Sequence, residues 1–312
     1  MVSTDGKATV ISIYFDQNLD SETASKSAGD LQEKYDGERD GVQIYVAGLQ
    51  TVYHSINTAI KEDLVKAESI AIPLNILMLL IIFGTAVAAG LPMIVALASV
   101  FGSFLTLFLI SQVTDISVFA LNLITGLGLG LGIDYALLIV NRFREELHSG
   151  HDVESSVAKS VATAGRTVFF SGIAVMLVLA SMVLFPQYFL KSFAYAGISV
   201  VLFAVLASIL GLPAVLALLG HKIDKWKIRK SALVNNDHGG WAKTAQTVMK
   251  RPLVFILASV AFLTVLALPA AKVKFGQVDD RVLQPTSPVA IAAEVSRNRF
   301  DGQAASPVEI II

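Results

Sequence analysis

Long stretches without charged side chains dominate the chain. Residues 69–114 contain no Asp, Glu, Lys, Arg or His. A helix needs about 20 apolar residues to cross a hydrocarbon core of roughly 30 Å, so this stretch holds two spans. Gly90 and Pro92 supply turn residues between them, which predicts spans at 67–88 and 92–112. Four more spans are predicted at residues 117–140, 167–186, 192–219 and 252–271. The pattern therefore predicts a polytopic α-helical membrane protein with six transmembrane helices.

The composition supports a membrane protein and excludes several other classes. Hydrophobic residues make up 54% of the 312 residues and charged residues 16%, which is too apolar for a soluble domain. A net charge of −1 leaves no basic excess for nucleic acid. The chain has no cysteine, and its five histidines show no metal-ligand spacing. We therefore predict no metal, no cofactor and no catalytic residue.

Two basic segments set the predicted orientation. They are the loop 141–166, with Arg142 and Arg144, and the linker 221–251. Short loops rich in Lys and Arg stay in the cytoplasm, whereas the opposite loops carry only Lys191. Both termini of the chain are then extracytoplasmic, and the two arginines are interpreted as cytoplasmic anchors. A capped amphipathic helix over 152–166 is expected to lie along the membrane interface.

Both ends of the chain are predicted to contain partial folded segments. Residues 1–66 have a β-α-β-α pattern, with strands at 7–15 and 42–46 and helices at 21–35 and 49–66. After the sixth span, a helix is predicted at 287–299 and an apolar strand at 307–312. Neither a signal peptide before the first segment nor a partner for the last strand is present, so we expect a piece of a larger protein. The alternative is a complete small membrane protein.

Four glycines alternate in the third span, at Gly126, Gly128, Gly130 and Gly132. A dinucleotide-binding loop is excluded because Leu131 stands where that motif requires glycine. On a helix, the glycines form two stripes of small residues on nearly opposite faces. We interpret all four as helix-packing positions.

Asp134 is the only Asp, Glu, Lys, Arg or His between residues 117 and 140. A charge at that depth costs about 2.5 to 3.5 kcal/mol on insertion scales, so it is expected to face the bundle interior and to have a partner. Tyr135 adds a hydroxyl that can donate to a carboxylate or accept from a carboxylic acid. A carboxyl that gains and loses a proton is what a proton relay requires. The alternative is a structural Asp that is kept neutral by one hydrogen bond.

Three segments together resemble the mycobacterial membrane protein large (MmpL) family of the resistance–nodulation–division (RND) superfamily. They are residues 126–135, 141–146 and 164–172. The resemblance implies a twelve-helix transporter with two similar halves. Residues 1–66 then resemble the C-terminal part of the first extracytoplasmic porter domain, and residues 67–220 helices two to six. The linker 221–251 is cytoplasmic, 252–271 resembles helix seven, and 272–312 the start of the second porter domain.

The same resemblance implies a function. Asp134 and Tyr135 match the family's proton-relay pair, and Ser171 on the next span matches a serine beside it. The implied activity is proton-motive-force-driven export of lipids or similar hydrophobic molecules across the bacterial inner membrane toward the cell envelope. The implied partners are membrane lipids, the hydrophobic substrate and the remainder of the transporter, and a homo-oligomer is left open.

Two other functional classes share features with this sequence. A non-transporting lipid sensor of the sterol-sensing type has a similar set of helices, but it would tolerate Asp134→Asn, whereas a proton-coupled exporter would not. An intramembrane aspartyl protease needs two carboxylates that share a proton. Its second acid is not found at membrane depth in this sequence.

Overall fold

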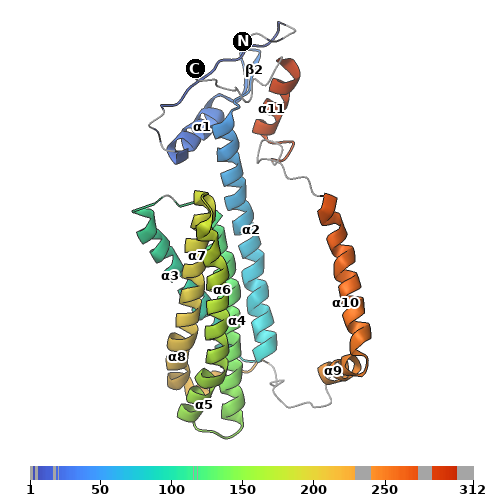
Figure 1. The fold of residues 1–312 in the computed structure, drawn as a ribbon. Coiled ribbons are helices and arrows are strands. Elements are labelled where there is room, and N and C mark those ends of the chain that lie inside the picture. The colour runs from blue at the N-terminus through green and yellow to red at the C-terminus, as the bar shows by residue number, and fades with distance from the viewer. Residues whose placement is uncertain are drawn as a thin grey trace. The chain divides into compact units, whose positions relative to one another are not determined.

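The structure is a computed structural model in two compact units (Figure 1). It describes residues 3, 6–16, 19, 21–114, 116–117, 119–228, 240–272 and 283–300. One unit comprises residues 68–238, and the other comprises residues 1–67 together with 239–312.

Six helices in the described part of the chain are long and apolar enough to cross a membrane. They cover Leu49–Phe83, Ala86–Ser111, Phe119–His148, Val153–Leu184, Tyr188–Asp224 and Pro252–Ala270. A helix satisfies all its backbone hydrogen bonds internally, which is why apolar segments of this length are helical in a bilayer. The predicted polytopic helical fold with six spans is confirmed.

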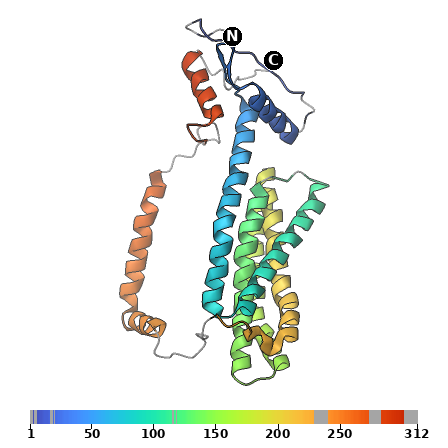
Figure 2. The same ribbon diagram turned by 180° about the vertical axis from the view of Figure 1, so that it is seen from behind.

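The unit 68–238 is a bundle in which α3 (Ala86–Ser111), α4 (Phe119–His148) and α7 (Tyr188–Leu206) pack against one another (Figure 2). Glycine allows the close approach. A Cβ on Gly132 would lie 2.6 Å from the Ala96 Cα, and one on Gly128 would lie 2.6 Å from the Val100 Cγ2. The core between these helices includes Ile124, Ile139, Val140, Phe143, Val200 and Val201, all fully buried.

Two of the membrane helices contain a π-helical turn. Helix α5 (Val153–Ser160) continues through η1 (Val161–Gly165) into α6 (Arg166–Ala180) and η2 (Ser181–Leu184). In the same way, α7 continues through η3 (Ala207–Gly211) into α8 (Leu212–Leu219) and η4 (Gly220–Asp224). The Asp152 carboxylate accepts a hydrogen bond of 3.2 Å from the Ser155 backbone N–H, so the predicted cap is confirmed. The predicted separate interfacial helix over 152–166 is wrong, because this segment is the first part of the helix that continues as α6.

The turn between the first two spans is not where the sequence predicted it. Helix α2 ends at Phe83 and α3 begins at Ala86, so Gly90 and Pro92 lie inside α3. Gly84 has a φ of +68°, a left-handed conformation that glycine adopts without steric cost and that commonly ends a helix. The predicted turn at residues 88–92 is therefore wrong. Pro92 lies inside α3, and membrane helices tolerate an internal proline because neighbouring groups satisfy the backbone group that it leaves unpaired.

The other unit begins with a helix and a hairpin. Helix α1 (Ser21–Tyr35) is confirmed. Strand β2 (Val42–Ile44) forms at the predicted place, but its antiparallel partner is β1 (Gly37–Arg39). The turn between them holds Asp40 and Gly41 at positive φ, as in tight hairpins. The predicted strand at 7–15 is wrong, since the structure assigns no strand there and Ile11, Ile13 and Tyr14 are exposed.

The predicted helices at 49–66 and 287–299 are confirmed. The first is the beginning of the continuous helix α2 (Leu49–Phe83), and the second is α11 (Pro288–Arg299). The Ser287 hydroxyl accepts a hydrogen bond of 3.2 Å from the Ala290 N–H and caps α11. Val289 is buried with Val52 and Ile56 of α2. The unit also contains α9 (Gly240–Lys250), α10 (Pro252–Ala267) and η5 (Leu268–Lys272), while the strand predicted at 307–312 lies outside the described residues.

The glycine contacts predict a difference between two alanine substitutions. Gly132→Ala places a methyl group against the α3 backbone, so we expect about 1–3 kcal/mol of destabilisation from overpacking. Gly90→Ala is the control, because nothing lies within 4 Å of its Cβ position. That change is expected to be neutral or to stabilise by about 1 kcal/mol through helix propensity. Thermal denaturation of detergent-purified protein carrying this segment measures both. Equal melting temperatures for the two variants would contradict the packing described here.

Candidate functional site

Asp134 and Tyr135 lie next to each other on α4 but face different surroundings. Successive helical side chains are about 100° apart, so one side chain can enter the bundle while its neighbour does not. Tyr135 is only 4% exposed and belongs to the bundle core. Its hydroxyl lies 3.5 Å from the Ser171 Oγ on α6, and either atom can be the donor. The structure therefore brings together two of the three predicted relay residues.

The position of Ser171 follows from the packing of α6 on α7. A Cβ on the neighbouring Gly172 would lie 2.4 Å from the Val205 Cγ2, so the two helices are in close contact there. This contact holds the Ser171 hydroxyl opposite α4. The Ser171 residue as a whole is nevertheless exposed. A separation of 3.5 Å is at the long limit for a hydroxyl hydrogen bond, which makes this a weak contact.

Asp134 lies on an open face of α4. The residue is exposed, and within the described residues its carboxylate has no hydrogen bond and no ion pair. Gly126 and Gly130 share this face, and nothing lies within 4 Å of a Cβ on either. The prediction that this face is closely packed and buried is therefore wrong for the described chain. The packed stripe is that of Gly128 and Gly132, because α3 and α7 contact the opposite face of α4.

Sequence reasoning missed a buried charge at the C-terminal end of α4. Arg144 is 1% exposed, which its interpretation as a simple cytoplasmic anchor did not predict. Its Nη2 and Nε lie 2.8 Å and 3.1 Å from the Asp224 Oδ1, and its Nη1 donates to the Phe83 carbonyl at 3.0 Å. The two partners are far from Arg144 in the sequence. No local pattern could have indicated these contacts.

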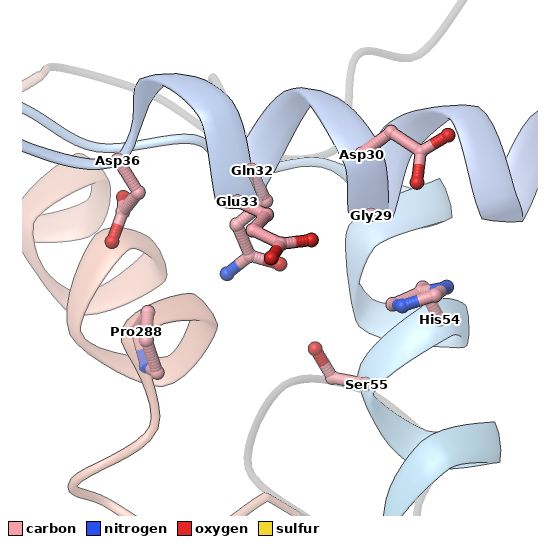
Figure 3. A pocket seen from close by; sticks show the side chains of 8 residues that line it. All are labelled: Gly29, Asp30, Gln32, Glu33, Asp36, His54, Ser55 and Pro288. Atoms are coloured by element: carbon pink, nitrogen blue, oxygen red, sulfur yellow. The ribbon is translucent and has the colours of Figure 1, made fainter.

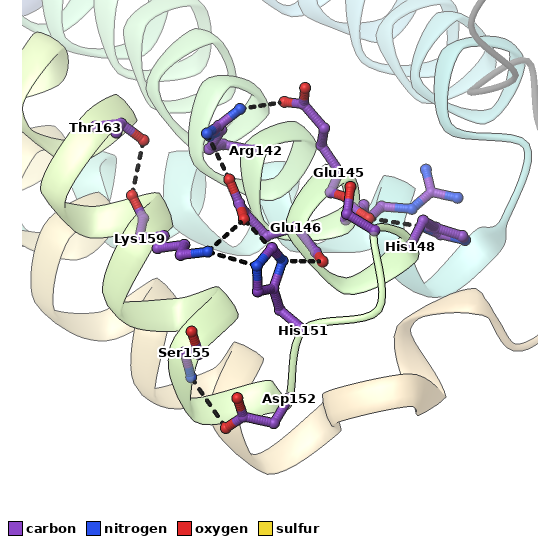
Figure 4. A network of polar contacts seen from close by, with 11 residues as sticks. Arg142, Glu145, Glu146, His148, His151, Asp152, Ser155, Lys159 and Thr163 are labelled. Carbon is purple, nitrogen blue, oxygen red and sulfur yellow. Dashed lines mark hydrogen bonds and ion pairs between the residues drawn. The ribbon is translucent and has the colours of Figure 1, made fainter.

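A second group of charges surrounds Glu146 on the same end of α4 (Figure 4). The nearly buried carboxylate lies 2.5 Å from the Arg142 Nη2, 3.1 Å from the His151 Nδ1 and 3.4 Å from the Lys159 Nζ. Lys159 also lies 2.6 Å from the His151 Nε2. These contacts join the end of α4 to His151 in the turn that follows it and to Lys159 in the last turn of α5. They stabilise the turn between the two helices.

The described part of the other unit has a hollow between α1, α2 and the start of α11 (Figure 3). Its lining is mainly polar and consists of Gly29, Asp30, Gln32, Glu33, Asp36, His54, Ser55 and Pro288. Among the described residues, no group of three His, Asp or Glu side chains is arranged to hold a metal ion. Pockets for apolar ligands are lined by hydrophobic side chains, so this hollow does not have the character of a lipid site.

Six apolar helices, one of them with an Asp within its span, define a multi-pass α-helical membrane protein by architecture. The chain belongs to the MMPL family, whose model matches residues 1–255. This finding confirms the family resemblance seen in the sequence.

Three relatives illustrate the similarity. The chain is 36% identical over 315 residues to the membrane protein SCO6666 of Streptomyces coelicolor, covering 100% of this chain and 44% of that protein. It is 33% identical over 342 residues to the trehalose monomycolate exporter MmpL3 of Mycobacterium tuberculosis, covering 100% of this chain and 36% of the relative. It is 30% identical over 287 residues to the mycolic acid-containing lipids exporter MmpL11 of Mycolicibacterium smegmatis, covering 90% of this chain and 30% of the relative. The chain thus spans less than half the length of these relatives.

The long hydroxyl contact predicts that Tyr135→Phe leaves the fold intact. Phenylalanine keeps the buried ring, and only a weak hydrogen bond to Ser171 is lost, so we expect a loss of about 1 kcal/mol or less in stability. Thermal denaturation of the detergent-purified protein measures this. Tyr135→Ala is the comparison, since it also removes the ring and is expected to cost about 3–5 kcal/mol. A large loss with phenylalanine would show that the hydroxyl contact is stronger than its geometry indicates.

Proposed function

We propose that this chain is part of a proton-motive-force-driven exporter, with Asp134 as its proton-carrying group. The substrate class is lipids or other hydrophobic molecules, moved across the inner membrane toward the cell envelope. The observation that carries the proposal is the lone carboxyl of Asp134 in the apolar part of α4, on a face without any partner in the described chain. Ionisable groups within a membrane span mark proton or substrate pathways in transporters.

The energy that a proton releases on crossing the membrane potential is comparable to the cost of an ionised Asp in a membrane helix. One elementary charge that crosses a potential of about 100 mV releases about 2.3 kcal/mol. An ionised Asp at the centre of a membrane helix costs about 2.5 to 3.5 kcal/mol on insertion scales. Protonation removes that cost, so a single proton transfer at Asp134 is sufficient to change the preferred surroundings of this face of α4. The transporter needs no nucleotide for such a step.

The open face of α4 also supports the proposal that further spans cover it. Gly126 and Gly130 leave room for the close approach of another helix beside Asp134. The relatives are more than twice as long as this chain, which leaves ample sequence for such spans. In this assignment, residues 1–66 and 272–312 belong to two extracytoplasmic porter domains, both chain ends are extracytoplasmic, and 221–251 is a cytoplasmic linker.

The lipid substrate class comes from the relatives. MmpL3 and MmpL11 are named as exporters of trehalose monomycolate and of mycolic acid-containing lipids. This supports secondary active transport of a related amphiphile rather than an enzymatic reaction. Tyr135 and Ser171 are proposed as the hydroxyl groups beside the relay, because their contact connects α4 to α6.

The first functional prediction concerns Asp134→Asn in a full-length protein that carries this segment. Asparagine is similar in size but cannot titrate, so membrane abundance should stay near normal while gradient-driven export is lost. The measurement is lipid movement in proteoliposomes with an imposed pH gradient. Asp152→Asn is the matched control, since asparagine is an equally good helix cap and this site lies outside the apolar region. Full gradient-dependent movement by Asp134→Asn would make Asp134 a structural residue and favour the lipid-sensor alternative.

The second functional prediction concerns the orientation of the segments. The chain contains no cysteine, so a single cysteine introduced into it reports one position. We expect membrane-impermeant maleimide to label exposed positions at Thr58 and Asn298 on intact cells. Cysteines at Glu154 and His221, which are also exposed, should react only after permeabilisation. Labelling of either cytoplasmic position in intact cells would contradict the assigned orientation.

A further inference from the structure

Arg144 is the largest of the fully buried side chains in the described part of the chain. A guanidinium stays charged at any physiological pH, so its burial requires a full set of acceptors. These acceptors come from outside α4. One is the Asp224 carboxylate at the end of η4, and the other is the Phe83 carbonyl at the end of α2. The centroid of the Phe83 ring also lies 5.7 Å from the Arg144 guanidinium.

The two segments that hold Arg144 are also bonded to each other. The Ile228 N–H donates to the Gly84 carbonyl at 2.9 Å, and the Ala86 N–H donates to the Trp226 carbonyl at 3.2 Å. The Thr85 hydroxyl, which is buried, donates to the Ile223 carbonyl at 3.2 Å. The α2–α3 turn and the segment after α8 therefore form one hydrogen-bonded support that does not involve Arg144. Arg144 is the side chain that attaches the end of α4 to this support.

His148 strengthens the same attachment from the next turn of α4. Its Nδ1 lies 2.6 Å from the Arg144 carbonyl oxygen, and its Nε2 lies 3.1 Å from the Asp224 Oδ2. Both partners are acceptors, so both contacts are hydrogen bonds only when each ring nitrogen carries a proton. Since His148 is about half exposed, Arg144 remains the principal link between α4 and the support.

Arg142 lies two residues earlier and is arranged differently. It is about one-third exposed, and its ion-pair partners, Glu145 and Glu146, belong to its own helix. These contacts do not reach the α2–α3 turn or the segment after α8. The chain thus offers two arginines on one helix end, of which only Arg144 joins α4 to those segments.

We propose that Arg144 and Asp224 are positioning residues for export. They fix the cytoplasmic end of α4, so that a displacement of this helix on proton transfer at Asp134 is passed to the α2–α3 turn and to the segment after α8. Without the pair, the end of α4 moves independently and proton movement is uncoupled from lipid movement. This inference rests on the proposed function, because it requires Asp134 to carry the proton.

The experiment measures two fluxes in proteoliposomes that contain the full-length transporter. A pH-sensitive dye inside the vesicles reports proton movement, and a trehalose monoester with a fluorescent acyl chain reports lipid movement. For Arg144→Gln we expect near-native proton flux and about tenfold less lipid moved per proton, a usual size for coupling between two sites. Arg142→Gln is the matched control, and its ratio should stay within about twofold of the native ratio, because the ion-pair partners of Arg142 lie on α4 itself.

A second variant distinguishes a loss of coupling from a failure of Arg144→Gln to fold. Arg144→Gln leaves the Asp224 carboxylate without its main partner, whereas Arg144→Gln combined with Asp224→Asn leaves no unpaired buried charge. The double variant should therefore fold. It should still move less lipid per proton, because two amide side chains do not replace the ion pair between Arg144 and Asp224. A folded double variant with the native ratio would overturn the proposal, as would a proportional fall of both fluxes, which indicates a structural role alone.

The proposed function has its own test in the same assay. Asp134→Asn should abolish gradient-dependent movement of both protons and lipid. If Asp134→Asn still moves lipid under the gradient, the relay assignment fails whatever the Arg144 variants show. If Asp134→Asn is inactive and the Arg144 double variant keeps the native ratio, the relay stands and only the positioning role is rejected.

Discussion

The absence of water in the membrane interior is the constraint on which the rest of this structure depends. Every backbone polar group in the hydrocarbon must be paired within the protein, which limits the spans to helices. Apolar side chains gain little by leaving lipid, so helices associate through close contact of small residues. Gly128 and Gly132 meet this requirement on α4, where a Cβ on either would collide with α3. The arrangement of α3, α4 and α7 follows from these contacts.

The same constraint suggests different roles for two of the charged groups on α4, Arg144 and Asp134. Arg144 is buried but fully paired, so its charge is compatible with a fixed position at the helix end. Asp134 is unpaired within the described chain and lies among glycines on an open face. A structural charge would be expected to have partners, as Arg144 does. We therefore expect the partners of Asp134 in the further spans that are proposed to cover this face.

Structural features that depend on neighbouring residues in the sequence were predicted well. The six spans, the Asp152 cap and the helices α1 and α11 all follow from hydrophobic runs and capping residues. Features that depend on distant partners were not. The pairing of Arg144 with Asp224 joins residues on different helices, and the orientation of the Asp134 face depends on which side of α4 receives α3 and α7. The strand predicted at 7–15 is also absent from the described structure, because β-propensity depends more on the surroundings of a segment than on its own residues.

The shapes of the helices support transmission along α4 in particular. Helix α4 runs without interruption from Phe119 to His148, so Asp134 and Arg144 lie on one regular element. Two of the membrane helices that contact α4 are interrupted by the π-helical turns η1 and η3, which contact each other. A π-helical turn disrupts the regular hydrogen-bond ladder and is a frequent site of local adjustment in helices. A displacement that begins at Asp134 would therefore be carried along α4 as a unit, while the neighbouring helices adjust at η1 and η3.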